Sequence, residues 1–350
     1  MPYDDAVPSD VMNAAIYQGD GRIAIGQVPV PEPGPGELLV EVDGCGICGS
    51  DLHLVFGKYA TPGAILGHEW SGTVVSGNGA GSARAPGTRV VSSPSPGCGA
   101  CRPCRRGRPS VCVGRPASDM RDMRGAFARY TVVRETGTLV VPDSLSLRGA
   151  ALAEPTAIAL HAVELAGVGP DDRVLVTGGG PIGLIIVSVL LARGVTDITV
   201  SEPSGLRRER ALAVGAARTV RPETLTVPPT GALVAAPVDV AFECSGSASA
   251  GEQALANLDR AGTLVFVGTG AEPVPVNQNR MIILELEALG TYNYSADGFQ
   301  PALDLLDSGA MPLDLLIEPG AVPLGGVMEA MERLSRGEIP GKVLVGPQSA

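Results

Sequence analysis

Apolar residues change their spacing along the chain near residue 154. Before that point they form short runs at 14–16, 23–25 and 38–40, and turns rich in glycine and proline, such as 31–36, separate these runs. Short apolar runs bounded by turns are typical of β-strands. The first part of the chain, from Met12 to about residue 142, therefore predicts a meander of strands.

After residue 154, apolar segments of helical length alternate with shorter apolar runs of strand length. Strands that alternate with helices are joined by right-handed crossovers and form a parallel sheet. We therefore predict a doubly wound sheet in this part of the chain. The expected strands are 173–177, 198–201, 238–242, 264–267 and 289–292, and the expected helices are 157–166, 182–192, 206–214 and 251–258.

The last part of the chain predicts two helices, at 300–308 and 325–336, and a final strand at 342–345. We expect this tail to pack back onto the first domain, which makes that domain discontinuous. A length of 350 residues suits two domains of ordinary size. The predicted fold class is α/β, with the following parts: a β-rich domain over 1–155, a doubly wound domain over 156–295, and a C-terminal segment over 296–350.

A glycine-rich turn lies between the predicted strand 173–177 and the predicted helix 182–192. Gly178, Gly180 and Gly183 match the pattern G-x-G-x-x-G. Such a turn lets the backbone approach a pyrophosphate, and the helix N-terminus offers free N–H groups to it. We therefore predict a dinucleotide site rather than a plain turn, and its residues include Gly178, Gly180, Pro181, Ile182 and Gly183.

Glu202 follows the next predicted strand, 19 residues after Gly183. A carboxylate at this place accepts hydrogen bonds from the adenosine ribose and repels a 2′-phosphate. This favours NAD over NADP, with a simple surface acid as the alternative. Arg207 and Arg208 follow closely and could help to hold a phosphate, so we include Arg207 among the cofactor-binding residues.

Four cysteines at 98, 101, 104 and 112 have the spacing C-x2-C-x2-C-x7-C. Four thiolates can close a tetrahedral shell around zinc and leave no position for substrate. The lobe over 97–113 therefore predicts a structural zinc site. Its arginines would also suit a zinc ribbon that binds nucleic acid, but the acidic chain and the absence of interleaved aromatic residues argue against that alternative. The predicted ligands are Cys98, Cys101, Cys104 and Cys112.

A second set of candidate ligands lies outside this lobe. Cys48 and His68 offer one soft and one borderline ligand, which suits zinc. Glu69 and Glu154 are candidates for the remaining protein ligand, and the sequence leaves the choice between them open. A catalytic zinc keeps three protein ligands and one free position. Cys45 and Cys48 also form C-x-x-C, but the zinc motif makes a redox pair the weaker alternative.

Charge and composition exclude several classes of partner. The net charge is −11, whereas a nucleic-acid surface needs a basic stripe. The first ten residues lack the basic start and apolar run of a secretory signal, and the apolar run 182–191 is too short to span a bilayer. Six of the seven cysteines fall in two clusters, a pattern typical of metal ligands in a reducing compartment. We therefore expect a cytoplasmic protein without nucleic-acid or membrane partners.

Together these motifs resemble the zinc-dependent medium-chain dehydrogenases, which form the alcohol dehydrogenase superfamily. The Gly-His-Glu and Glu-Pro pieces are most similar to sorbitol, butanediol and threonine dehydrogenases. The resemblance covers nearly the whole chain from Met12 to Val345. The pieces that carry it are Cys48-Gly49-Ser50-Asp51-x-His53, Gly67-His68-Glu69, the four-cysteine lobe, Glu154-Pro155 and the glycine turn.

The resemblance implies a GroES-like β-rich catalytic domain, a Rossmann domain, and a homodimer or homotetramer. It implies two zinc ions per chain, one structural and one catalytic. Asp51 would hydrogen-bond His68 and fix its orientation. Ser50 would lie beside the substrate hydroxyl, and His53 would pass the proton to solvent. Lys342 is a candidate for a basic residue that contacts the cofactor in this family.

The expected reaction is the reversible oxidation of a secondary alcohol to a ketone, with hydride transfer to NAD. The substrate would be a polyol, a diol or an amino alcohol. An NADPH-dependent carbonyl reductase is the alternative enzyme, and Glu202 argues against it. A non-catalytic zinc- and nucleotide-binding scaffold is the alternative from another class, and the intact Cys48, Ser50, His53 and His68 argue against it.

Overall fold

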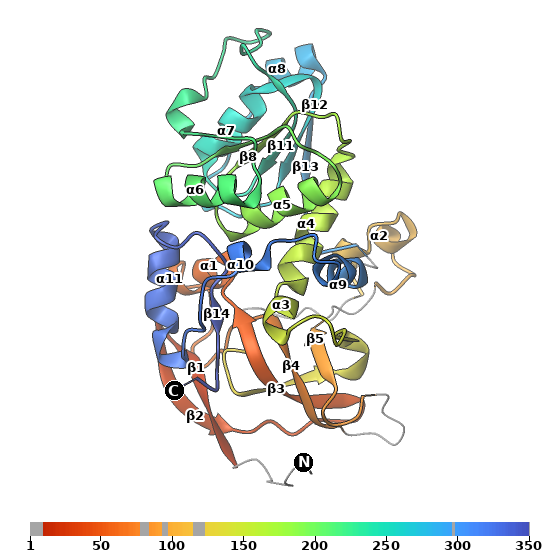
Figure 1. Cartoon of the computed structure of the whole chain (residues 1–350), viewed down its shortest axis with the longest axis vertical. Helices are drawn as coiled ribbons and strands as arrows, with labels where there is room; N and C mark the ends of the chain where they lie inside the picture. Colours follow the sequence, from red (N-terminus) through yellow and green to blue (C-terminus); the bar gives the residue numbers. More distant parts are fainter. Residues whose placement is uncertain (1–9, 78–83, 93–96, 115–122, 296–297, 350) are drawn as a thin grey trace.

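The computed structural model describes residues 10–77, 84–92, 97–114, 123–295 and 298–349. A parallel sheet with its helices occupies the upper half of the molecule, and an antiparallel sheet occupies the lower half (Figure 1). Helix α4 (Ala153–Ala166) lies between the two halves. Within the described residues, no helix is long and apolar enough to cross a membrane.

The predicted meander of strands is confirmed. Strands β1 and β2 form a ribbon, and the larger antiparallel sheet has the order β14-β3-β4-β5-β7, with β6 also paired to β3. The last strand of the chain therefore lies beside one of the first. The strands are β1 (Val11–Gly19), β2 (Arg22–Pro29), β3 (Glu37–Gly46), β4 (Glu69–Gly77), β5 (Arg89–Ser92), β6 (Tyr130–Arg134), β7 (Thr138–Val140) and β14 (Leu344–Val345).

The predicted doubly wound sheet is also confirmed. Six parallel strands have the order β10-β9-β8-β11-β12-β13, so the strand order reverses between β8 and β11. Ligands of such sheets bind at the carboxyl ends of the strands, at this switch point. The strands are β8 (Val174–Thr177), β9 (Ile198–Ser201), β10 (Arg218–Val220), β11 (Val238–Glu243), β12 (Leu258–Phe266) and β13 (Glu287–Gly290).

The helices differ from the predicted ones in two places that matter for function. α4 begins at Ala153 rather than at residue 157, because Pro155 fits a first helical turn, where no N–H is needed. Helix α1 (Gly49–Phe56) falls where the sequence predicted only strands and turns. The other helices are α2 (Arg102–Arg105), α3 (Leu147–Ala150), α5 (Pro181–Ala192), α6 (Gly205–Val214), α7 (Ala248–Ala256), α8 (Gln278–Leu284), α9 (Phe299–Asp307), α10 (Leu313–Leu316) and α11 (Val327–Ser335).

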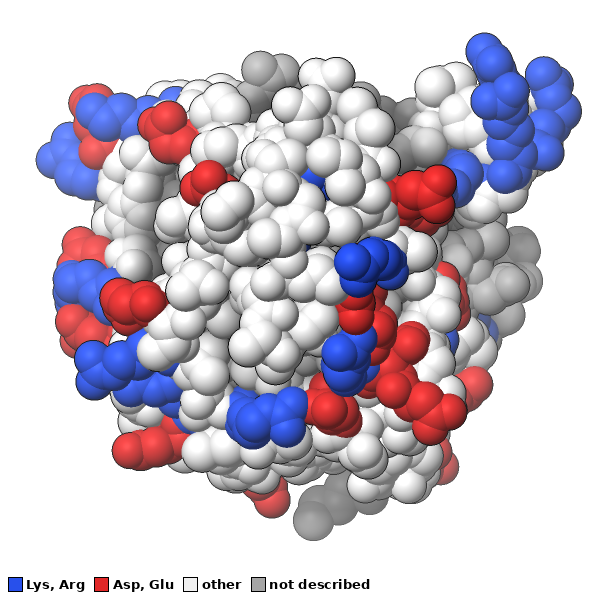
Figure 2. Space-filling view, turned by 90° about the horizontal axis from the view of Figure 1, so that it is seen from above, with Lys and Arg blue, Asp and Glu red and all other residues white. Residues whose placement is uncertain are grey.

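Aliphatic side chains build the cores, as the 3% aromatic content suggests. The run that is too short to span a bilayer is helix α5, whose residues from Gly183 to Leu190 are buried between α4 and the parallel sheet. Charged side chains border a broad uncharged area when the molecule is seen from above (Figure 2). Exposed arginines at 102, 105, 106 and 108 belong to the lobe around α2, and basic side chains crowd the projecting corner on that side of the molecule.

Candidate metal and dinucleotide sites

One cluster of metal-ligating side chains forms where β3 and β4 run side by side. Gly46 at the end of β3 pairs with Glu69 at the start of β4, and Cys48 follows β3 as the residue that caps α1. This register brings Cys48, His68 and Glu69 together, with one ligand atom of each within 4.8 Å of the others. A sulfur, an imidazole nitrogen and a carboxylate in this arrangement suit zinc.

Helix α1 fixes the residues that follow Cys48. The carboxylate of Asp51 accepts a hydrogen bond from the N–H of Cys48 (3.0 Å) and so caps the helix. Its other oxygen lies 3.7 Å from Nδ1 of His68, which is longer than a hydrogen bond. Both of these atoms are buried and have no hydrogen-bond partner among the described residues. A cation on the imidazole would draw the two groups together, so this arrangement fits a metal site.

Lys342 neutralises the carboxylate of Glu69. Both side chains are buried, and the ammonium lies 2.7 and 2.8 Å from the two carboxylate oxygens. The same ammonium donates to the carbonyl of Ile47 (3.2 Å). A Cβ on Gly46 would lie only 2.2 Å from the Glu69 carboxylate, so only glycine fits there. The sequence does not predict this ion pair, although Lys342 is one of only two lysines in the chain.

Glu154 lies near this cluster but is not part of it. It occupies the first turn of α4, and its carboxylate is not grouped with the ligand atoms of Cys48, His68 and Glu69. Burial raises the pKa of Glu154 to about 7, and the charge of His68 opposes the rise. Of the two candidates for the third ligand, Glu69 is grouped with Cys48 and His68, whereas Glu154 is not.

His53 on α1 reaches across to the domain of the parallel sheet. Its Nε2 lies 2.6 Å from the carbonyl oxygen of Thr269, in the loop after β12. Because a carbonyl only accepts, Nε2 carries the proton and Nδ1 keeps its lone pair when the ring is neutral. Ser50 lies one turn before His53, at the start of the helix, and is half-buried.

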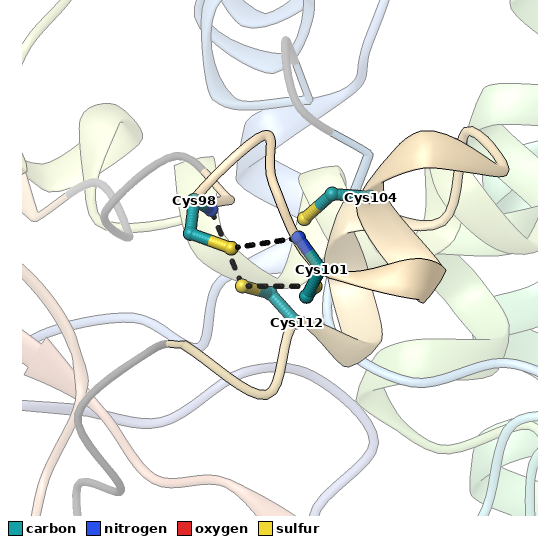
Figure 3. A group of neighbouring side chains, drawn as sticks. All are labelled: Cys98, Cys101, Cys104 and Cys112. Atoms are coloured by element: carbon teal, nitrogen blue, oxygen red, sulfur yellow. Dashed lines mark hydrogen bonds between the residues drawn. The ribbon is translucent and has the colours of Figure 1, made fainter.

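The four cysteines of the lobe also come together (Figure 3), with their sulfurs within 4.8 Å of one another. Backbone N–H groups of Cys98 and Gly114 lie 3.2 and 3.3 Å from the sulfur of Cys112, and they lower its pKa to about 6. Burial and the neighbouring thiols raise the pKa of Cys104 to about 12. Four sulfurs this close cannot all ionise without a cation, so the cluster fits a closed zinc shell.

The glycine turn has the tight geometry that the sequence predicts. Gly178 has φ +101°, a conformation that favours glycine. A Cβ on Gly183 would lie 2.0 Å from the carbonyl oxygen of Gly178, so α5 can approach the turn only with glycine there. Gly180 caps α5, and Pro181 and Ile182 belong to its first turn, where the missing N–H of proline removes no helical hydrogen bond.

Glu202 is buried beside this turn. Its carboxylate accepts hydrogen bonds from the N–H groups of Gly179 (2.7 Å) and Ser204 (2.9 Å). Arg207 donates to the carbonyls of Leu334 and Ile339 in the C-terminal segment, at 3.1 Å each. Both residues line a cavity of about 730 Å³ between the start of α6 and the end of α11.

Two family models match the chain. That of the alcohol dehydrogenase GroES-like domain matches residues 34–143, and that of zinc-binding dehydrogenases matches residues 181–308. Sorbitol dehydrogenase of Bacillus subtilis is 31% identical over 335 residues, which cover 92% of this chain and 93% of the relative. L-threonine 3-dehydrogenase of Pyrococcus abyssi is 34% identical over 329 residues, which cover 91% and 93%.

A solved structure supports the same likeness. It is described as that of a zinc-binding dehydrogenase from Sinorhizobium meliloti bound to NADP, and it is 33% identical. The match covers 97% of this chain and 100% of that chain, with a TM-score of 0.83. The similarity therefore extends over both domains.

Proposed function

Because the chain belongs to the zinc-dependent medium-chain dehydrogenases of the alcohol dehydrogenase superfamily, we propose that it oxidises secondary alcohols reversibly to ketones with NAD. One observation carries the proposal. Cys48, His68 and Glu69 place their ligand atoms within 4.8 Å of one another, on the side of the molecule where His53 reaches the dinucleotide domain. The candidate metal site and the dinucleotide-binding domain would thus come together near this contact.

Cys48, His68 and Glu69 would hold the catalytic zinc, and the four cysteines of the lobe would hold the structural one. A catalytic zinc supplies Lewis-acid chemistry that makes an alcohol hydroxyl more acidic. Asp51 would orient His68 once a bound metal draws the two groups together, and Lys342 keeps the charge of Glu69 from being buried alone. The residues around the metal would thus keep the three ligand side chains in one arrangement and balance their charge.

Ser50 and His53 would take the hydroxyl proton away. Nε2 of His53 is engaged with Thr269, so Nδ1 is the nitrogen that is free to accept a proton. The side chain is exposed, so it can release this proton to water. The nicotinamide supplies the hydride acceptor.

Glu202 would select NAD. The residues Gly178, Gly180, Pro181, Ile182 and Gly183 would cradle the pyrophosphate at the start of α5. The cavity beside Glu202 and Arg207 would take the adenosine end. We expect a higher kcat/KM with NAD than with NADP. A Glu202→Ser variant should narrow that difference, because it removes the charge that repels a 2′-phosphate. A wild-type preference for NADPH would instead support the carbonyl reductase. NADP is the cofactor bound in the solved structure of one relative.

The substrate class follows from the relatives, which are named for sorbitol and threonine. Both compounds carry a secondary hydroxyl beside a second polar group. We expect NADH formation, followed by absorbance, with polyols, vicinal diols or amino alcohols, and slower turnover of their mono-alcohol analogues. His68→Ala serves as the control, because it should remove turnover while the fold survives. No turnover of any compound in the panel would contradict the proposal.

We also propose a homo-oligomer, either a dimer or a tetramer, built on the edge strand β13. Among the strands that the structure describes, this one has a partner on one side only, and the preceding α8 exposes Ile282 (64%) and Ile283 (59%). A second copy would cover both features. Sedimentation should give a dimer or larger assembly, and Ile283→Lys should weaken it. Leu212→Lys, which alters an exposed apolar residue of α6, is the matched control. A wild-type monomer would contradict this.

We place the enzyme in the cytoplasm. All the cysteines are unpaired thiols, and most of them are grouped as metal ligands. A reducing compartment preserves such groups. Cell fractionation should recover the protein with cytoplasmic markers, and its recovery from a secreted fraction would contradict this assignment.

A further inference from the structure

Glu243, the last residue of β11, is a buried carboxylate without a cation. It is 1% exposed, and it belongs to none of the ion pairs among the described residues. Its oxygens accept hydrogen bonds from the N–H of Ser245 (2.7 Å), from the Ser245 hydroxyl, and from the N–H of Gly246 (3.0 and 3.1 Å). Burial raises the pKa of Glu243, and these donors favour its charged form.

The segment that Glu243 holds forms one wall of the glycine turn. β11 is the neighbour of β8 at the switch point of the sheet, and the N–H of Cys244 donates to the carbonyl of Thr177 (2.8 Å). A Cβ on Gly178 would lie 3.0 Å from the nitrogen of Ser245. The backbone of the glycine turn therefore rests directly on the segment 244–246.

The same segment also sets the loop after β12. The main-chain oxygen of Glu243 accepts hydrogen bonds from the N–H groups of Val267 and Gly268, at 2.8 Å each. A Cβ on Gly246 would lie 2.2 Å from the oxygen of Thr269, and one on Gly270 would lie 1.9 Å from the oxygen of Gly246. Two backbones packed this closely cannot move independently.

The oxygen of Thr269 is the acceptor for Nε2 of His53. A shift of this carbonyl would release the imidazole and allow the other tautomer, in which Nδ1 carries the proton. That tautomer has no lone pair on Nδ1 to accept a proton from substrate. The position of the Thr269 carbonyl therefore determines whether Nδ1 of His53, in the other domain, can accept a proton.

We propose that Glu243 is a positioning residue for the dehydrogenase reaction. Its carboxylate holds the segment 244–246, which in turn supports the glycine turn on one side and the Thr269 carbonyl that orients His53 on the other. This inference rests on the proposed function, since the dinucleotide and the proton path both belong to it. An amide only partly replaces the carboxylate, because the N–H of Gly246 is shared by both carboxylate oxygens and would face an NH2 group at one of the two positions.

Glu243→Gln is the first test. We expect NADH affinity, measured by calorimetry, to fall about 10-fold, since small misplacements at a binding site are costly. We expect kcat for alcohol oxidation to fall more steeply at low pH than at high pH, because hydroxide in solution can replace a misplaced His53. Ser245→Ala removes only one donor to the carboxylate and should show the same changes in weaker form.

Val265→Ala is the matched control. Val265 is a fully buried residue of β12, so its truncation destabilises the same sheet while it removes none of the hydrogen bonds of Glu243. We expect a lower melting temperature with unchanged NADH affinity and an unchanged pH profile. If Glu243→Gln gave only this pattern, Glu243 would be structural and the inference would be overturned.

A double variant tests the route through His53. In a His53→Ala background, Glu243→Gln should no longer change the pH dependence of kcat, because interacting residues are not additive. Additive effects would contradict an influence of Glu243 through His53.

If the wild type oxidises no alcohol, the proposed function fails. NADH affinity and hydrogen exchange at 244–247 and 267–270 still decide whether Glu243 positions the loops. Unchanged exchange and affinity would overturn the inference.

Discussion

Single side chains set the charge balance of the candidate zinc site. Two acids, a thiol and an imidazole converge around Cys48, and Lys342 supplies the one positive charge that directly pairs with Glu69 among the described residues. The sequence predicts Cys48 and His68 and offers Glu69 as one of two candidates for the third ligand, because these residues lie in short motifs. It does not predict the partner of Glu69, because Lys342 is 273 residues away along the chain and only the fold brings the two together.

Lys342→Met should destabilise the metal-free protein by about 3–5 kcal/mol, because it leaves the Glu69 carboxylate buried and unpaired. Zinc should reduce this loss, since the metal replaces the missing charge. Denaturant unfolding with and without a chelator measures both effects. The control is Lys58→Met at the other lysine, whose pair with Asp20 is exposed and should contribute less than about 1 kcal/mol. Equal losses for the two variants would contradict this account.

Glu154 should make the stability of the metal-free protein depend on pH. Burial raises its pKa from 4.5 to about 7, so the folded state holds a proton that the unfolded state releases. This contribution is complete below pH 4.5 and is lost as pH rises through about 7. The free energy of unfolding of the wild type should therefore fall over this range relative to Glu154→Gln. Parallel pH profiles for the two proteins would show that the carboxyl is not protonated in the fold.

At the scale of elements, hydrophobic periodicity predicts most of the parallel sheet, but it does not predict helix α1 beside the candidate metal site. The central strand β8 is Val-Leu-Val-Thr and gives a strong sequence signal, whereas the short edge strand β10, with Arg218 and Thr219, is not predicted. Helix α1 has only Asp51 and Val55 buried, and its first turn is fixed by the cap between Asp51 and Cys48. That cap is a local hydrogen bond rather than an apolar pattern, so hydrophobic spacing does not reveal it.

The glycine turn gives a direct test at this scale. Gly183→Ala places a Cβ 2.0 Å from the carbonyl oxygen of Gly178, so α5 must move away from the turn. We expect NADH affinity to fall strongly and stability to fall by about 1–3 kcal/mol, as for other overpacked sites. Gly205→Ala at the start of α6 is the control, because its Cβ would meet nothing closer than 3.7 Å. NADH binding of normal affinity by the first variant would contradict the assignment of the turn.

At the scale of the whole molecule, the C-terminal segment joins the two domains. Strand β14 pairs with β3, while Arg207 of α6 binds carbonyls at the end of α11. The sequence predicts a tail that returns to the first domain, and its exact boundaries at residues 155 and 295 stay predictions. Contacts such as that of His53 with Thr269 could not be predicted, because both residues lie in loops or short helices whose placement depends on how the domains meet.

The most direct test of the central claim is zinc content per chain, measured by mass spectrometry together with NADH formation. The wild type should hold two zinc ions and oxidise a polyol or amino alcohol. His68→Ala should hold one and lose turnover, and Cys104→Ser should lose the other ion and keep turnover in the molecules that stay folded. A His68→Ala protein that still holds two ions and still forms NADH would contradict the account.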